Sequence, residues 1–128
     1  MSYYISKTID SEFNQAVSQI TERLSLEGFG IISQVDIKQK LKDKLDIEFR
    51  DYLILGACNP SKAFQALEQE DKVGTMLPCN VIVQEIGDKK IEVAAVDPVA
   101  SMMAIHNPAL KDLAIEIREK LTKAIESL

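Results

Sequence analysis

Long apolar runs are missing from this sequence, and so is a leader of the secretory type. No stretch approaches the roughly 18 consecutive apolar residues that cross a bilayer. The N-terminal MSYYISKTIDSEF has no basic segment followed by an apolar one. We therefore expect a cytoplasmic protein without a membrane partner. Repeats, linkers and low-complexity tracts are missing as well, which predicts one domain over residues 1–128.

Cysteine and histidine are scarce. Two cysteines do not make a disulfide scaffold in a domain of this length, and in a reducing compartment they would be thiols. The sequence also has no Ser-His-Asp arrangement, Gly-rich phosphate loop, dinucleotide fingerprint or pair of zinc knuckles. These absences disfavour an enzyme with a familiar motif, and they leave the identity of any cofactor unknown.

Positive charge is in deficit, because 15 Lys and Arg face 20 Asp and Glu, for a net charge of -5. Such a field repels the phosphates of nucleic acids, so we predict no nucleic-acid partner. What is present is an ordinary globular composition with 46% hydrophobic residues, enough for one core.

Hydrophobic periodicity predicts alternating strands and helices. Alternating or continuous apolar patterns predict strands at residues 3–8, 29–36, 52–59, 79–86 and 91–96. Apolar residues three and four apart predict a helix from a cap at Asp10 or Ser11 to a stop at Gly28, and others over residues 36–45, 60–70 and 107–128. Residues 99–106, VASMMAIH, are apolar but ambiguous.

The strand Tyr52–Asn59 is apolar on both faces. This pattern is typical of a strand that is covered on both sides or lies at an oligomer contact. Together with the apolar segment Val99–Ile105, it gives more apolar surface than a few amphipathic helices easily cover. We therefore predict a homodimer.

Several short motifs point to a family. Ala57-Cys58-Asn59-Pro60 and Pro78-Cys79-Asn80 are the most specific, and Gly28-Phe29-Gly30, Val35-Asp36-Ile37 and Asp97-Pro98 accompany them. Together they resemble, from end to end, the bacterial and archaeal family catalogued as domain of unknown function 302. The resemblance implies an α+β fold with an antiparallel sheet and helices on one side. The implied order is strand, helix, four strands, helix, similar to one repeat of the TATA-binding protein, with residues 36–45 and 60–70 as helical insertions. It implies no catalytic residue, because the family's activity is not established.

Cys58 and Cys79 each stand at a strand end beside an asparagine. Asn59-Pro60 predicts a helix start, because asparagine accepts from free amides and proline fits the first helical position. If the two strands run antiparallel, as the implied fold requires, both thiols lie at one sheet edge beside that helix start, where thiolates and anions are favoured. We therefore predict a site for a small or anionic ligand at Cys58, Asn59, Cys79 and Asn80. The alternative is that both cysteines are small buried hydrophobes.

His106 and a lysine cluster are further candidates. His106 could join Cys58 and Cys79 in a soft metal site for copper or zinc, but a lone histidine before a helix is more often a surface or capping residue. Four lysines flank the apolar stripe of residues 36–45, namely Lys38, Lys40, Lys42 and Lys44. They either bind an anion or cover the rim of that stripe with their stems.

Three functions remain open from the sequence. The leading prediction is a small cytoplasmic binding domain, homodimeric, with its pocket at the edge that carries Cys58 and Cys79. The first alternative is a thiol- or metal-dependent enzyme that uses the same two cysteines. The second is a purely structural interaction module.

Overall fold

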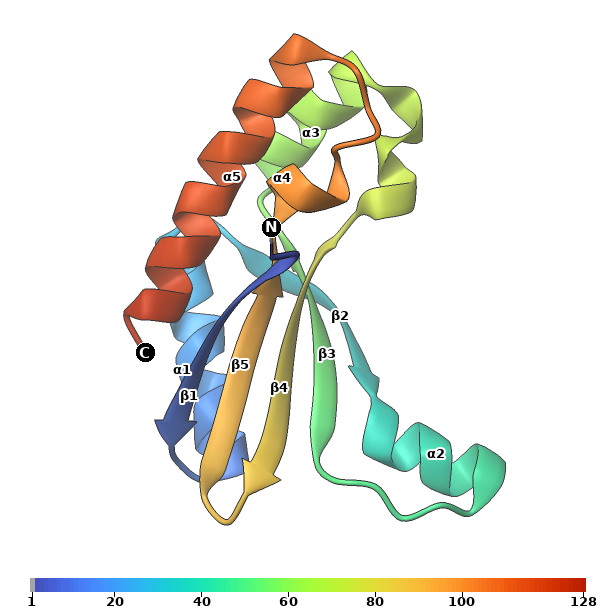
Figure 1. The fold of residues 1–128 in the computed structure, drawn as a ribbon, viewed down its shortest axis with the longest axis vertical. Coiled ribbons are helices and arrows are strands. Elements are labelled where there is room, and N and C mark those ends of the chain that lie inside the picture. The colour runs from blue at the N-terminus through green and yellow to red at the C-terminus, as the bar shows by residue number, and fades with distance from the viewer. Residues whose placement is uncertain (1) are drawn as a thin grey trace.

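The structure, a computed structural model, describes residues 2–128 and contains one five-stranded sheet with helices around it (Figure 1). The elements in chain order are β1 (Tyr4–Asp10), α1 (Phe13–Leu26), β2 (Gly30–Asp36), α2 (Ile37–Leu45), β3 (Tyr52–Cys58), α3 (Pro60–Gln69), the 3-10 helix η1 (Asp71–Met76), β4 (Cys79–Gly87), β5 (Lys90–Val96), α4 (Pro98–Ser101) and α5 (Pro108–Glu126). The predicted α+β class is confirmed, and each predicted strand and helix is present with ends that differ by a residue or two.

The sheet is antiparallel throughout, with the strand order β1-β5-β4-β3-β2. The β4–β5 hairpin and β3 form its centre, and β1 and β2 are its edges. Ala57 of β3 lies opposite Cys79 of β4, so the two cysteines come to the same end of neighbouring strands, as predicted. The element order matches the predicted one once α2, α3, η1 and α4 are set aside, while the likeness to a TATA-binding-protein repeat stays a prediction.

One face of the sheet carries the hydrophobic core. Helix α1 packs against β2, β4 and β5, and α5 packs against β1, β5 and α1. Alternate strand residues point to these helices, because successive side chains of a strand point to opposite faces. The buried strand residues are Leu53, Leu55, Ala57, Cys79, Val81, Val83, Ile91, Val93 and Ala95. Of the helices within residues 2–128, none is both long enough and apolar enough to cross a membrane.

The other face of the sheet, which we call the open face, is turned to the viewer in Figure 1, where no helix of residues 2–128 crosses it. Its side chains are those that alternate with the buried ones, among them Tyr4, Ser6, Val35, Tyr52, Ile54, Asn80, Ile82, Gln84, Glu92 and Ala94. Within this chain β3 is thus covered on one side only. The sequence left two explanations for the apolar residues on both faces of β3, cover on both sides or an oligomer contact. Cover on both sides by this chain is wrong.

Side-chain caps fix most helix starts. Asp36 accepts from the Gln39 amide at 2.9 Å, and Asn107 accepts from the Ala109 amide at 3.0 Å. The predicted cap of α1 at Asp10 or Ser11 is wrong: β1 continues to Asp10, and α1 starts only after Glu12, which makes no side-chain cap bond. The side-chain cap bonds of the other helices provide acceptors for amides of the first helical turn, which have no partner within the helix.

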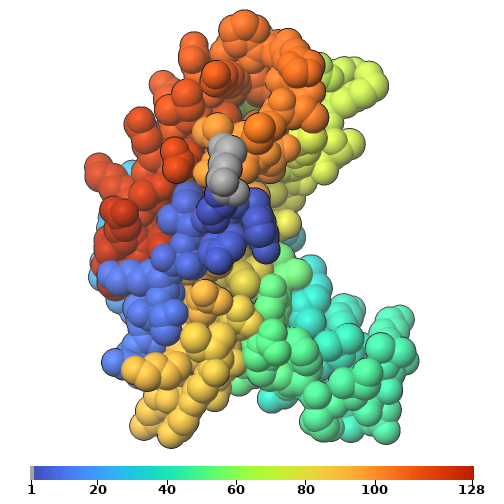
Figure 2. Space-filling view, viewed as in Figure 1, coloured from blue at the N-terminus to red at the C-terminus, as the bar shows by residue number. Residues whose placement is uncertain are grey.

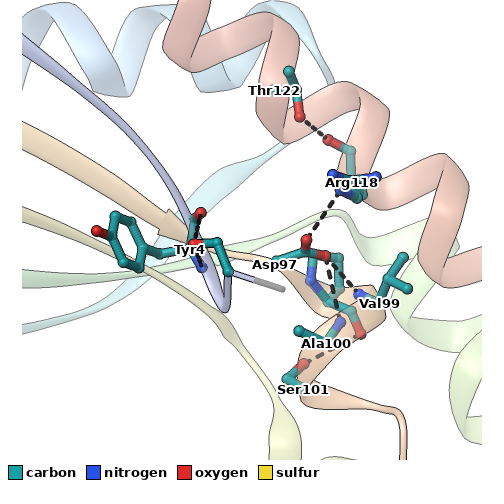
Figure 3. A network of polar contacts seen from close by, with 9 residues as sticks. Tyr4, Asp97, Val99, Ala100, Ser101, Arg118 and Thr122 are labelled. Atoms are coloured by element: carbon teal, nitrogen blue, oxygen red, sulfur yellow. Dashed lines mark hydrogen bonds and ion pairs between the residues drawn. The ribbon is translucent and has the colours of Figure 1, made fainter.

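The ambiguous segment after β5 begins with the short helix α4. Asp97 precedes it, is 3% exposed, and accepts from the amides of Val99 and Ala100 at 2.9 and 3.4 Å (Figure 3). Its other oxygen lies 3.0 Å from Nε of Arg118 on α5. A buried carboxylate needs such partners, because its desolvation is costly. Asp97 therefore ties the end of β5 to both α4 and α5.

Candidate functional site

Where β3 ends and β4 begins, the protein holds a cavity of about 320 Å³. Its floor is the end of the sheet, and its walls come from β2, α3, α5 and the segment before β4. The lining residues are Phe29, Ile32, Ala57, Cys58, Asn59, Lys62, Ala63, Ala66, Leu67, Gly74, Leu77, Pro78, Cys79 and Ile117. Most of these side chains are apolar, so the cavity suits an apolar molecule better than an ion.

Both cysteines line this cavity. Cys79 is 5% exposed, and Cys58 is half-buried. Neither forms a disulfide in the structure. The strand register explains why they meet at the same end of the sheet: Cys79 opens β4 opposite Ala57, and Cys58 is the last residue of β3.

The environment of Cys79 keeps its proton on. Burial, and secondarily the neighbouring Cys58, raises the pKa of the Cys79 thiol from its ordinary 9.0 to about 11. We expected the helix start to lower the pKa of a thiol here, but for Cys79 the cost of desolvating the thiolate is the larger effect. Only the thiolate is a good nucleophile, so Cys79 is poorly suited to nucleophilic chemistry near neutral pH.

Asn59 joins two helices at the rim of the cavity. Its side-chain oxygen accepts from the Lys62 amide at 3.4 Å, and its side-chain nitrogen donates to the Glu27 carbonyl at 3.4 Å. Gly28 has φ +88°, and a Cβ built there would lie 2.9 Å from that nitrogen. The close approach of α1's end to α3's start therefore depends on glycine at position 28.

Lys62 is the one cationic side chain among the lining residues, and it was not among the site residues predicted from the sequence. Its Nζ lies 2.7 Å from Glu116 of α5, and this contact lowers the pKa of the Glu116 carboxyl. No local pattern marks this pair, because the two residues are 54 positions apart. Ile117 reaches the cavity in the same way, from an apolar helix face that the sequence assigned only to the core.

Helix α3 presents a narrower inward face than its sequence pattern predicts. Ala66 is buried, but Phe64 and Leu67, the large apolar side chains at helical spacing, are 64% and 44% exposed. The reason is that α3 packs against α5 and η1 rather than lying flat on the sheet. Leu67 consequently stands at the mouth of the cavity together with Ile32, which is 64% exposed.

Comparison with known families gives one decisive match. The profile described as "Domain of unknown function DUF302" matches residues 5–128. The chain belongs to the DUF302 family. A crystal structure of an uncharacterized conserved DUF302 protein from Bacillus stearothermophilus has a TM-score of 0.90 to this chain at 26% identity, and the alignment covers 98% of each chain. Comparison with curated proteins gives no match.

Asn80 and His106 do not meet the two thiols in this DUF302 domain. Asn80 follows Cys79 along β4 and therefore points to the open face, where it lines a different hollow of about 420 Å³. His106 is exposed and lines a third hollow, of about 560 Å³, beside α4 and α5. Within residues 2–128 no group of three or more His, Cys, Asp or Glu side chains is placed to hold a metal ion. The predicted set of Cys58, Cys79 and His106 is thus not brought together.

Proposed function

We propose that this DUF302 chain is a small cytoplasmic binding domain, and that its ligand is a small, largely apolar molecule in the cavity at Cys58 and Cys79. The observation that carries the proposal is that both thiols line one mostly apolar cavity of about 320 Å³. Ligand sites are typically concave, apolar and furnished with a few polar groups. Two free thiols are in line with a reducing compartment.

The other two hollows are larger, but their lining supports the binding of an apolar ligand less well. The hollow beside His106 lies under the segment that joins α4 and α5, and the hollow on the open face is floored by the exposed side of the sheet. The lining of the thiol cavity exposes more apolar surface and far less polar surface than the lining of either other hollow. A ligand there would lose more of its apolar surface to the protein, which is the main favourable term in such binding.

The polar rim favours an acidic head group over a basic one. The ammonium of Lys62 and the first turn of α3 both lie at the rim, and both favour a negative charge. Glu116 already pairs with Lys62, so an acidic ligand competes with that contact. We therefore expect a preference for the acid rather than an absolute requirement.

Three eight-carbon probes that differ only in head group test this proposal. Octanoate has about as many non-hydrogen atoms as the cavity accommodates at roughly 30 Å³ each, and octanol and octylamine have the same chain. We expect octanoate to bind with a dissociation constant on the order of 0.1–1 mM, octanol more weakly, and octylamine weakest. Amide chemical shifts of Ala57, Cys58 and Ala63 in heteronuclear NMR spectra report the binding.

A matched pair of variants on α3 locates the bound probe. Ala63→Phe places a ring in the cavity and is expected to weaken octanoate binding about tenfold or more. Gln65→Phe adds the same ring at an exposed position of the same helix and should leave binding unchanged. If no probe shifts these amides, or if Ala63→Phe binds octanoate as wild type does while both variants are folded, the cavity is not the ligand site.

We also propose that the chain is homodimeric. The support is the open face, where apolar side chains of β2, β3, β4 and β5 are only partly covered by residues 2–128. An apolar surface of this kind on a small domain is typical of a contact with another protein.

A further inference from the structure

Helix α2 and the residues after it form a segment that the rest of the chain scarcely covers. We call residues 37–50 the arm. It leaves the lower end of the sheet and stands apart from the upper helices, and Figure 2 shows an indentation between them. No residue of α2 is buried, and the helix packs against β3. The arm is held to the body by its two chain connections, by the contact of α2 with β3, and by the hydrogen bond from Arg50 to Gln84 of β4.

The apolar side of the arm is only partly covered within residues 2–128. Ile37 and Leu41 are only half-buried, while Leu45 and Ile47 are 62% and 45% exposed. A nine-residue helix is shorter than the ~12–15 residues at which isolated helices become even marginally stable in water. Packing of its apolar side against another surface is what ordinarily stabilises such a helix.

The open face offers an apolar surface that leads to the arm. Strand pairing places Ser6, Ala94, Ile82, Ile54 and Val35 opposite one another in a single row across all five strands. Four of these five side chains are apolar, and the row ends at β2, from which α2 directly continues. The open face and the arm thus form one continuous surface.

The charges of the arm and the body are complementary. The arm has five Lys and Arg residues and three Asp and Glu residues, so its net charge is +2. The net charge of the whole chain is -5, so the rest of the chain carries -7. Lys40 and Lys44 have no ion-pair partner within residues 2–128, and neither has Glu92 on the open face. An arm that is basic and a body that is acidic suit each other when they belong to two copies of one chain.

From these observations we infer that a second copy of this chain packs on the open face and that each arm closes over the body of the other copy. The inference rests on the homodimer proposed above and specifies its surface. A twofold axis along the strands, in front of the open face, carries the arm from the β2 edge of one copy to the side of β5 and β1 in the other. Glu92 of β5 lies on that side, where Lys40 and Lys44 of the partner reach it.

Charge reversal tests the contact in both directions. Lys40→Glu/Lys44→Glu and Glu92→Lys should each weaken the dimer by about tenfold or more, as measured by sedimentation velocity over a range of concentrations. Mixing the two variants should restore the dimer, because each acidic arm then meets a lysine and each wild-type arm meets a wild-type Glu92. The double variant Lys111→Glu/Lys123→Glu is the control. It makes the same change of charge at exposed positions of α5, away from the open face, and should leave the dimer intact.

The outcomes separate the surface from the dimer itself. A wild-type chain that stays monomeric at 100 µM would overturn both the homodimer and the surface inferred here. If the wild-type chain dimerises and the arm and Glu92 variants dimerise equally well, the homodimer proposal stands and the inferred contact surface is wrong. Loss of the dimer in each variant without recovery on mixing overturns the contact between arm and Glu92. None of these results depends on octanoate binding.

Discussion

The two faces of the sheet are built from neighbouring residues and differ in what covers them. On the covered face, Leu53 and Leu55 of β3 are 6% and 1% exposed beneath the helices. On the open face, Ile54 of the same strand is half-buried although it is as apolar as the two leucines, and Tyr52 is half-buried as well. The strand sequence alone does not distinguish the two sides. The difference comes from α1 and α5, which are distant in the sequence and pack on one side only.

This comparison assigns separate roles to the two faces. The covered face supplies the folding free energy, because most of the apolar area removed from water lies there. The open face contributes less to folding and is available for contact with another chain. Changes on the covered face should therefore lower stability more than matched changes on the open face.

The largest expected effect comes from Leu55 and its neighbour Ile54. Leu55→Ala should lower the free energy of unfolding by about 3–4 kcal/mol, because it removes a fully buried side chain and leaves a cavity. Ile54→Ala should lower it by about 1 kcal/mol or less, because that side chain is only half-buried. Urea unfolding followed by circular dichroism, at concentrations where the variants are monomeric, measures both values. Equal losses would show that the open face is as important for folding as the covered one.

A second, smaller difference between the two faces concerns how the free energy of unfolding depends on pH at Cys79 and at its neighbour Asn80. Because the folded-state pKa of Cys79 is about 11 and the ordinary value is 9.0, the folded protein keeps a proton that the unfolded chain loses. The associated stability is complete below about pH 9 and is lost as the pH rises from about 9 to about 11. The loss is about 2–3 kcal/mol in that window.

The variant Cys79→Ala isolates this contribution from other groups that titrate in the same range. We expect the fall in unfolding free energy between pH 8 and pH 10.5 to be smaller in Cys79→Ala than in wild type. Asn80→Ala, which changes the adjacent residue on the open face, should keep the wild-type slope. Parallel curves for wild type and Cys79→Ala would mean that burial does not hold the Cys79 proton.

Local patterns in the sequence were sufficient for the elements and for part of the site. Asn59-Pro60 has its own physical cause, since the side chain caps the helix that proline begins. The shared edge of Cys58 and Cys79 depended on the antiparallel order that the family resemblance implied. Given that order, the placement of both thiols at the same end of neighbouring strands could be predicted.

What the sequence did not reveal depends on contacts between distant residues. Asn80 was grouped with Cys79 because the two are adjacent, although adjacent strand residues point to opposite faces. Lys62 and Glu116 meet only because α3 crosses α5. His106 was predicted to share a metal site with the cysteines only because histidine and cysteine are common ligands of the same metals. The fold places it beside α4 and α5 instead.

The smallest difference concerns two polar networks, one buried and one on the open face. Asp97 holds two amides of α4 and Nε of Arg118, and its side chain is 4% exposed (Figure 3). Gln84 links Arg50 to Glu92 across the open face, with hydrogen bonds of 2.8 Å on each side.

Asp97→Ala should lower the free energy of unfolding by about 2 kcal/mol, because it leaves the α4 amides and a partly screened guanidinium unpaired. Gln84→Ala should cost about 0.5 kcal/mol or less, since water can replace each bond. Thermal unfolding of both variants at pH 7 tests the difference, and a Gln84 loss as large as the Asp97 loss would mean that the open-face network is itself structural.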